Sequence, residues 1–370
     1  MLQKLLLNTT LKSICNIKCI RKFSDHSVNS LPKRIFSGIQ PTGTIHLGNY
    51  LGAIRQWVRL QEEDNGIILS IVDLHSMTLR HDPKVLSENI LKMTATLLAV
   101  GLDPKKVIIF QQSSVPQHTE LFWYLSCIST MARLAHLPQY KEKSAQLKDI
   151  PLGLFVYPVL QAADILAYRA THVPVGEDQL QHLQLSQELT KMFNNRFKTK
   201  FPIPHAVITE NAKIKSLRNP EKKMSKSDPD TKGCIYITDS EEEITKKIKK
   251  AITDFISEVE YKPETRPGVS NLVLMHSAVT GKPIETIIND AKGLSTAEYK
   301  HIVASEVNDH LSPIREKYYE YLDNPQHLLD VLESGRSIVT PIAEETLRDV
   351  RKALGVGFNV NNKQMLSVNI

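Results

Sequence analysis

The sequence has little cysteine and no long apolar run, and each shortage argues against a class of protein. Only four cysteines occur in 370 residues, and two of them, Cys15 and Cys19, lie near the N-terminus. The other two, Cys127 and Cys234, are far apart, so the sequence predicts neither a disulfide framework nor a zinc site. No run of about 18 consecutive apolar residues occurs, so we predict no membrane-spanning helix.

Metal-binding motifs and repeats are also missing. The 13 histidines form no H-E-x-x-H or similar pattern, and no segment recurs at a fixed period. What is present suits a folded protein, with 41% hydrophobic and 23% charged residues. The length suggests two domains with an additional tail. A net charge of +6 is compatible with a polyanionic partner.

The first 24 residues differ from the rest of the chain. No acid precedes Asp25, and apolar and hydroxyl residues are interspersed with five cations: Lys4, Lys12, Lys18, Arg21 and Lys22. A secretory signal has one unbroken apolar core, whereas this mixture is typical of a mitochondrial transit peptide. We therefore predict that residues 1–30 are a cleaved transit peptide and that the protein works in the mitochondrial matrix, where free cysteines are stable. A frayed basic N-terminus is the alternative.

From residue 34 onward, short apolar runs alternate with helical patterns. The runs are RIFSGI (34–39), GIILSIV (66–72), KVIIFQQ (106–112) and THVPVG (171–176). The best-defined helix between them begins with Asp82 as N-cap and Pro83 in its first turn, and stops at Gly101. Strands separated by helices predict parallel βαβ units. We expect an α/β fold, with a Rossmann-like doubly wound parallel sheet in a catalytic domain over residues 31–227.

Beyond residue 228 the patterns are helical, so we expect an all-α domain over residues 228–325. In SEEEITKKIKKAITDF (240–255) an isoleucine recurs every four residues, at positions 244, 248 and 252, which predicts an amphipathic helix with these three on its apolar face. Residues 326–370 are predicted to form C-terminal helices that pack back on the catalytic domain. Trp57 and Trp123 fall on apolar helix faces and are predicted to be core residues.

The stretch SGIQPTGTIHLGNYLGA (37–53) has the order strand, Pro/Gly turn, helix start. A helix N-terminus presents unpaired N–H groups and the positive end of the helix dipole, which suits phosphate. Gly48 allows a flat ligand to approach the backbone, and His46 and Asn49 add hydrogen-bonding groups. The stretch is neither a Walker loop nor a dinucleotide fingerprint. A capped helix after a tight turn is the alternative.

A second unusual stretch is NPEKKMSKSDPD (219–230), which is rich in lysine, bounded by prolines, and predicts neither helix nor strand. HLGN at 46–49 resembles the HIGH signature of class I aminoacyl-tRNA synthetases, and KMSKS at 223–227 matches their second signature letter for letter. From Phe36 to Asp230 the chain resembles tryptophanyl-tRNA synthetases, through FSGIQPTG, GNYLGAIRQ, VDLH, YPVLQAADIL, VPVGEDQ and KMSKSDP in the family's order. The resemblance is weaker beyond about residue 285.

The resemblance implies a mobile cationic loop that holds the phosphates of ATP. It implies that catalysis depends on four side chains: Lys223, Lys226, His46 and Lys143. It places ATP against these residues: Gln40, His46, Leu47, Gly48, Asn49, Gly176, Glu177, Asp178, Ile214, Lys223, Met224, Ser225, Lys226 and Ser227. Mg²⁺ would enter with ATP and be held largely by the phosphates, since the sequence has no carboxylate cage for it. For Lys143, a solvated lysine in a charged loop is the alternative.

Asp164 is a lone acid in an apolar helix, so its charge needs a partner. An indole N–H donates and cannot accept, which suits a carboxylate. In the family the matching aspartate binds this N–H; a structural pair with an arginine or a backbone amide is the alternative. The resemblance lines the tryptophan pocket with Asp164, Phe36, His75, Tyr157, Gln161, Val173, Val175 and Gln179. Gln161 stands where bacterial members have methionine.

These features predict a tryptophan–tRNA ligase that uses ATP, L-tryptophan and tRNA(Trp), with no membrane partner. The family is a homodimer, and its helical domain reads the anticodon. The lysines at 246–250 either contact tRNA phosphates or form a solvated helix face. The alternatives are a tyrosyl-tRNA synthetase, a non-catalytic RNA-binding protein of the same fold, and a nucleotidyltransferase that makes a different adenylate.

Overall fold

The computed structural model describes residues 33–63, 66–144, 147–176, 179–208, 213–226 and 230–357, with Lys143 described by its backbone alone. The predicted transit peptide at residues 1–30 lies outside this part of the chain. Glu177, Asp178 and Ser227 of the predicted ATP site also lie outside it.

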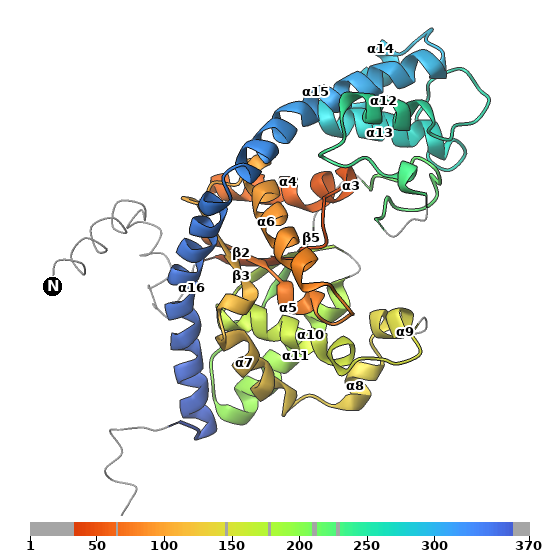
Figure 1. Ribbon diagram of the computed structural model, residues 1–370. Coiled ribbons are helices and arrows are strands. Elements are labelled where there is room, and N and C mark those ends of the chain that lie inside the picture. The colour runs from red at the N-terminus through yellow and green to blue at the C-terminus, as the bar shows by residue number, and fades with distance from the viewer. Residues whose placement is uncertain are drawn as a thin grey trace, which may run out of the picture.

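Five parallel strands form one sheet in the first part of the chain (Figure 1). They are β1 (Arg34–Ile39), β2 (Gly66–Ile71), β3 (Val107–Gln111), β4 (His172–Val175) and β5 (His205–Ile208). Their order is β3-β2-β1-β4-β5, so the chain first builds outward from β1 on one side and later returns to its other side. The predicted doubly wound parallel sheet is confirmed. The reversal of strand order lies between β1 and β4, where ligands bind in sheets of this kind.

The sheet is buried on both faces because its central strands are continuous apolar runs. Alternate residues of β2 enter two different cores: Ile67 and Leu69 pack on one side, and Ile68 packs on the other. The first core continues into α6 (Pro83–Ala99) and the C-terminal helical region. The second contains α7 (Gln117–Ser126), α10 (Leu152–Ala167) and α11 (Leu180–Phe197). Shorter helices in this part of the chain include α5 (Asp73–Ser76), α8 (Met131–Ala135) and α9 (Pro138–Ser144).

β5 is the strand that the sequence pattern did not predict. It has four residues, both of its ends are exposed, and it is hydrogen-bonded to β4 alone. An edge strand of this kind needs no continuous apolar run, so the signal used for the other strands is absent.

The second part of the chain is helical, as predicted. It contains α12 (Glu241–Lys249), α13 (Pro267–Thr280), α14 (Ile284–Asp290), α15 (Thr296–Leu322) and α16 (Pro325–Leu354). Figure 1 shows α15 running from this helical region to α16, which continues alongside the sheet. α16 packs on β3, α6, α7 and α10. The domain boundaries at residues 227 and 325 stay predictions.

Two predictions about helix faces are wrong. α12 ends at Lys249, so Ile252 lies outside the helix: its N–H donates to the carbonyl of Leu217 (2.8 Å), and its side chain is 46% exposed. Trp57 is buried, but Trp123 is 65% exposed. The inward stripe of α7 is formed by His118, Leu121 and Leu125, and residue 123 faces away from it.

Gly335 allows the α16 backbone to touch the sheet. A Cβ at this position would lie 1.9 Å from the carbonyl oxygen of Ile109 in β3, which is backbone and cannot rotate away. We expect Gly335→Ala to destabilise the fold by about 3 kcal/mol, since overpacking forces the backbone to shift. The midpoint of urea unfolding measures this. The control is Gly52→Ala, where a Cβ meets nothing within 4 Å. Equal midpoints for the two variants would contradict the close packing.

Candidate active site

The candidate site begins where β1 ends, next to β4 at the reversal of strand order. After β1 the chain turns at Gly43, which has φ +87°, and a helix starts at His46. The helix has three parts: α3 (Leu47–Asn49), the π-helical turn η1 (Tyr50–Ile54) and α4 (Arg55–Leu60). The predicted order of strand, turn and helix start is confirmed.

His46 is the N-cap of this helix. Its Nδ1 accepts a hydrogen bond from the backbone N–H of Asn49 (3.2 Å), so the neutral ring carries its proton on Nε2. Burial lowers the pKa of His46 to about 4, and the charges of Lys226 and Lys223 act in the same direction. At neutral pH His46 is therefore an uncharged donor through Nε2.

Gly48 lies between His46 and the KMSKS segment. A Cβ on Gly48 would lie 3.1 Å from Nδ1 of His46 and 3.4 Å from Cβ of Met224. The missing side chain thus makes room for protein atoms of the second signature. The prediction that Gly48 exposes backbone to a flat ligand stays a prediction.

The KMSKS segment folds back onto the turn after β1. Backbone hydrogen bonds from Met224 N to Ile214 O (3.1 Å) and from Ser216 N to Lys222 O (2.9 Å) shape the segment. Nζ of Lys226 donates to the carbonyl of Gly43 (3.1 Å) and lies 3.5 Å from both oxygens of Thr42. Lys226 of the second signature is therefore in direct contact with the turn that leads into the first.

Lys226 has an altered pKa, and this predicts a pH effect. Burial lowers its pKa from 10.5 to about 8, so the free protein loses this positive charge as the pH rises through about 8. For the ATP-dependent activity that the resemblance implies, we expect kcat/KM for ATP, which reports on the free enzyme, to fall about tenfold per pH unit above this value. Lys226→Arg keeps its charge and should move the decline to higher pH. Identical basic limbs in pyrophosphate-exchange profiles of the two proteins would contradict this assignment.

The other predicted ATP contacts fall into three groups. Gln40, Asn49, Gly176, Lys223 and Ser225 are exposed in this region. The side chains of Leu47, Ile214 and Met224 are buried in the core, so only their backbone is available, and the carbonyl of Ile214 is already taken by Met224. Lys143 lies in α9, and nothing further is described for its side chain.

Asp164 is the centre of a buried polar network in α10. One carboxylate oxygen, Oδ1, accepts from Gln112 Nε2 (2.8 Å) and His118 Nδ1 (2.6 Å), and Oδ2 pairs with His75 Nε2 (2.7 Å). Burial alone would raise the pKa of Asp164, but the hydrogen bonds from His118 and His75 hold it well below its usual range. Its partners are therefore neither the arginine nor the backbone amide that the sequence left open.

A chain of polar contacts leads from this carboxylate toward the end of β4. The ring of His75 meets Tyr157 edge-on, at 6.2 Å between centroids. Tyr157 OH lies 3.3 Å from His182 Nε2, whose Nδ1 lies 3.1 Å from Gln179 Oε1. Asp164, His75, Tyr157 and Gln179 of the predicted tryptophan pocket are thus brought together.

The apolar residues of the predicted pocket lie in the same core. Phe36 stacks on Tyr168 at 5.6 Å, and Val173 and Val175 are buried in β4. Gln161 is half-buried in α10.

Sequence reasoning missed the residues that surround this pocket: Gln112, His118, Gln139, Tyr168 and His182. His118 bridges Asp164 and Tyr168 OH (2.7 Å), and Tyr157 OH donates to Gln139 (2.9 Å). The position of His118 on the inward stripe of α7 was an available signal, because a buried polar side chain requires a partner.

Within the described residues, no three His, Cys, Asp or Glu side chains gather as a metal site. Searched over the same residues, the helices include none with the length and apolar character needed to cross a membrane.

The comparisons with known proteins agree with this geometry. The family model of class I tRNA synthetases for tryptophan and tyrosine (W and Y) matches residues 29–316. The chain belongs to this family of class I aminoacyl-tRNA synthetases. Within this family the chain is similar to tryptophan members. A tryptophan–tRNA ligase of Caldanaerobacter subterraneus subsp. tengcongensis is 44% identical over 325 residues. These residues are 88% of this chain and 98% of the relative.

Two crystal structures give the same result. Tryptophanyl-tRNA synthetase from Mycoplasma pneumoniae has a TM-score of 0.80 and 33% identity, covering 88% of this chain and 98% of its own. The enzyme from Campylobacter jejuni, complexed with ADP and tryptophan, has a TM-score of 0.77 and 32% identity, covering 87% and 100%.

Proposed function

We propose that this enzyme charges mitochondrial tRNA(Trp) with L-tryptophan in two steps. Its enzyme class, tryptophan–tRNA ligase, is that of relatives 41–44% identical over 87–88% of the chain. The observation that carries the proposal is the contact of Lys226 with Thr42 and Gly43, close to His46, in the turn after the carboxyl end of β1. His75 and Gln112 of the Asp164 network follow the carboxyl ends of β2 and β3 in the same parallel sheet.

In the first step, a carboxylate oxygen of tryptophan attacks the α-phosphorus of ATP. The bond from that phosphorus to its bridging oxygen breaks, and pyrophosphate leaves with Mg²⁺. Little proton transfer is needed, so positioning and charge stabilisation dominate. Lys226 and Lys223 supply cations for the departing phosphates, and His46 donates from Nε2 without adding charge. When ATP arrives, its phosphate oxygens replace the carbonyls that Lys226 contacts in this structure.

Tryptophan recognition rests on Asp164. A carboxylate offers about four acceptor positions, and Gln112, His118 and His75 use three of them. The remaining position on Oδ2 accepts the indole N–H. Phe36, Val173 and Val175 provide apolar walls, while Tyr157 and Gln179 bind the amino and carboxylate groups of tryptophan.

In the second step, the 2′-hydroxyl of the terminal adenosine of the tRNA attacks the adenylate carbonyl, and AMP leaves. The helical region binds the anticodon stem of the same tRNA.

Pyrophosphate exchange measured separately with each of the twenty amino acids tests the first step. We expect exchange with tryptophan alone. Exchange with tyrosine and none with tryptophan would support the tyrosyl alternative. No exchange with any amino acid would support the non-catalytic RNA-binding alternative.

The mitochondrial assignment is supported by the basic, acid-free composition of residues 1–24. Fractionation of cells that express the tagged full chain tests it, together with charging of mitochondrial and cytosolic tRNA(Trp). Recovery of the chain in the cytosol alone, or charging of the cytosolic tRNA alone, would contradict it.

We also propose a homodimer. Large apolar side chains are exposed around the start of α10: Met77, Leu79, Trp123, Met131, Ile150 and Leu152. α10 packs on α7 and α8, and Gly153 at its start faces Thr78, so these elements adjoin. A shared interface would explain why a residue such as Trp123 is not in the core. Sedimentation of the wild type and of Trp123→Glu measures this, and a monomeric wild type would contradict it.

A further inference from the structure

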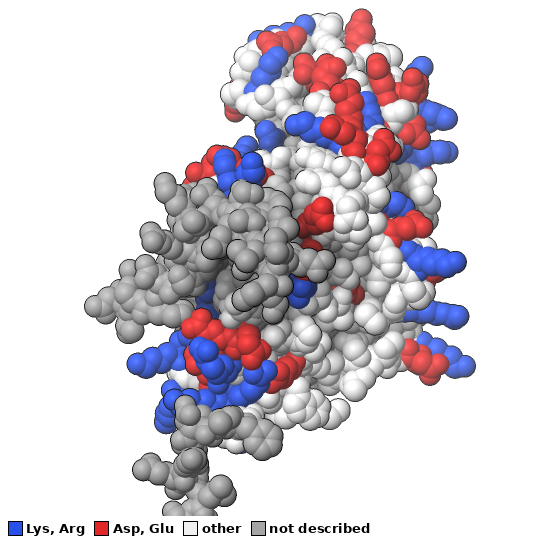
Figure 2. Space-filling view, turned by 60° about the vertical axis from the view of Figure 1, so that its left-hand side comes forward, with Lys and Arg blue, Asp and Glu red and all other residues white. Residues whose placement is uncertain are grey.

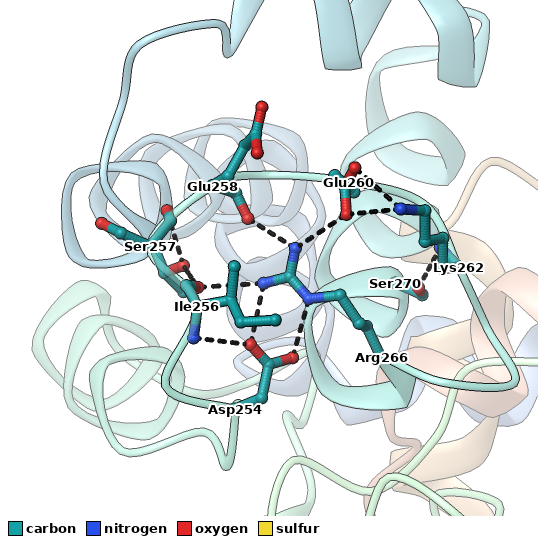
Figure 3. A network of polar contacts seen from close by, with 9 residues as sticks. Asp254, Ile256, Ser257, Glu258, Glu260, Lys262, Arg266 and Ser270 are labelled. Atoms are coloured by element: carbon teal, nitrogen blue, oxygen red, sulfur yellow. Dashed lines mark hydrogen bonds and ion pairs between the residues drawn. The ribbon is translucent and has the colours of Figure 1, made fainter.

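The segment between α12 and α13 has no regular secondary structure, yet its backbone is fixed by one side chain. Arg266 is 4% exposed and forms two hydrogen bonds to the carboxylate of Asp254 (2.9 and 2.8 Å). It also donates to the carbonyls of Ile256 (2.9 Å) and Glu258 (2.7 Å), as Figure 3 shows. Thr296, in the first turn of α15, donates to the same carbonyl of Ile256 (3.1 Å). The backbone on both sides of residue 255 is therefore held in place.

This fixed loop presents an aromatic side chain to solvent. Phe255 has a relative exposure of 108%, and its neighbours Ile252 and Ile256 are 46% and 55% exposed. A phenylalanine left in water forgoes the stabilisation of a buried one. Because the loop is already ordered, a ligand that covers Phe255 pays little conformational entropy.

The charges around Phe255 suit a polyanion. The end of α12, directly before the loop, carries three exposed lysines that form no ion pair with the described residues: Lys246, Lys249 and Lys250. The acids closest to the guanidinium, Asp254 and Glu260, are already paired with Arg266 and Lys262. Glu258 and Glu264 remain exposed on the loop.

We propose that Phe255 stacks on an unpaired base of the tRNA, while Lys249 and Lys250 contact the phosphates beside it. This inference rests on the proposed function and adds a contact residue to it. Single-stranded RNA loops offer bases that stack on aromatic side chains, and stacking tolerates different bases. Single-stranded RNA uses both features at once, the aromatic ring for a base and the lysines for the phosphates beside it, and we therefore favour it over a protein partner. Arg266 is the positioning residue that holds the platform.

The position of the loop separates its role from catalysis. Thr296 anchors the loop at the first turn of α15, whereas α15 meets the active-site helix 14 residues further along, or about 21 Å away, where His310 Nε2 lies 3.0 Å from Tyr50 OH. The Phe255 side chain itself is fully exposed and packs on no part of the active site. Loss of the Phe255 side chain should therefore affect tRNA binding and leave adenylate formation unchanged.

Aminoacylation of a tRNA(Trp) transcript by full-length Phe255→Ala tests this inference. We expect KM for tRNA to rise about tenfold or more, since one base–aromatic stack is lost, while kcat and tryptophan-dependent pyrophosphate exchange stay within about twofold of wild type. Phe255→Trp should restore the KM. The matched control is Tyr319→Ala, an exposed aromatic near the other end of α15.

The paired variant Lys249→Ala/Lys250→Ala should reduce the dependence of tRNA affinity on salt, because fewer counterions are released on binding. A KM for tRNA that is unchanged in Phe255→Ala, with normal exchange, would overturn the inference and leave the proposed function intact. An altered oligomeric state in Phe255→Ala with unchanged KM would assign the residue to a protein interface instead. Absence of exchange in the wild type would overturn the proposed function itself.

Discussion

Replacing Lys226 with alanine should slow formation of tryptophanyl-adenylate by about 10²–10³-fold. The ammonium is partly buried and lies at the turn between β1 and His46, where the phosphates of ATP are proposed to bind. A preorganised donor that stabilises developing charge is worth an effect of this size. The rate of tryptophanyl-adenylate formation in a single turnover, with saturating tryptophan and ATP, measures the change.

The control for this prediction is Lys222→Ala. Lys222 is an exposed lysine directly before the KMSKS motif, and its side chain forms no hydrogen bond or ion pair with the described residues. Its loss should change the rate by less than about threefold, since an exposed charge contributes little. Equal effects of the two substitutions would mean that general positive charge, and not the position of Lys226, supports the reaction.

The second large effect is expected from Asp164→Asn. The amide has the size of the carboxylate, but its NH₂ group cannot accept a hydrogen bond. Whichever way the amide is turned, its NH₂ group faces a buried N–H donor of His75, His118 or Gln112. We expect kcat/KM for tryptophan to fall about 10³-fold, because sites built to hydrogen-bond a polar substrate group discriminate strongly. KM for ATP should change little.

A matched substitution, Asp73→Asn, separates recognition from stability. Asp73 is also a buried acid, but it accepts from Gln111 and Ser113 and joins the ends of β2 and β3. Its replacement should lower the midpoint of thermal unfolding without a selective loss for tryptophan. If both variants lose tryptophan activation in proportion to their unfolding midpoints, Asp164 has a structural role only.

The overall charge distribution does not by itself show where tRNA binds. On the face drawn in Figure 2, lysines, arginines and acids are mixed over the helical region, and a broad uncharged area lies below it. A net charge of +6 over the whole chain thus does not identify a binding face. Local groups such as the unpaired lysines of α12 carry that information instead.

Most of the fold was predictable because its signals are local. The apolar runs at 34–39, 66–71 and 107–111 form strands that are buried on both faces of the sheet. Their own residues are therefore enough to predict them as strands. Asp82, Pro83 and Gly101 mark the limits of α6 in the sequence itself, and the Asp82 side chain caps Lys84 N at 2.8 Å. The edge strand β5 and the exposure of Trp123 were not predictable in this way. Each depends on whether other elements of the fold cover that strand or that side chain.

The candidate site was predictable in part. The two signatures identified Lys226 and His46 as members of one site, and the lone acid in an apolar helix identified Asp164. His75 was expected in the same pocket, but its pairing with Asp164 was missed, as were the other two donors, Gln112 and His118. The three lie 89, 52 and 46 residues away from Asp164 in sequence.

By itself, the sequence determined the class of fold and the order of its motifs, because burial periodicity, capping residues and motif letters act within a few neighbouring positions. Tertiary structure alone decided that Lys226 meets Gly43, 183 residues away, and that Phe255 stands outside on a loop fixed by Arg266. The physical reason is that a hydrogen bond between distant residues, or the exposure of one side chain, depends on how whole elements pack, and no local pattern encodes that.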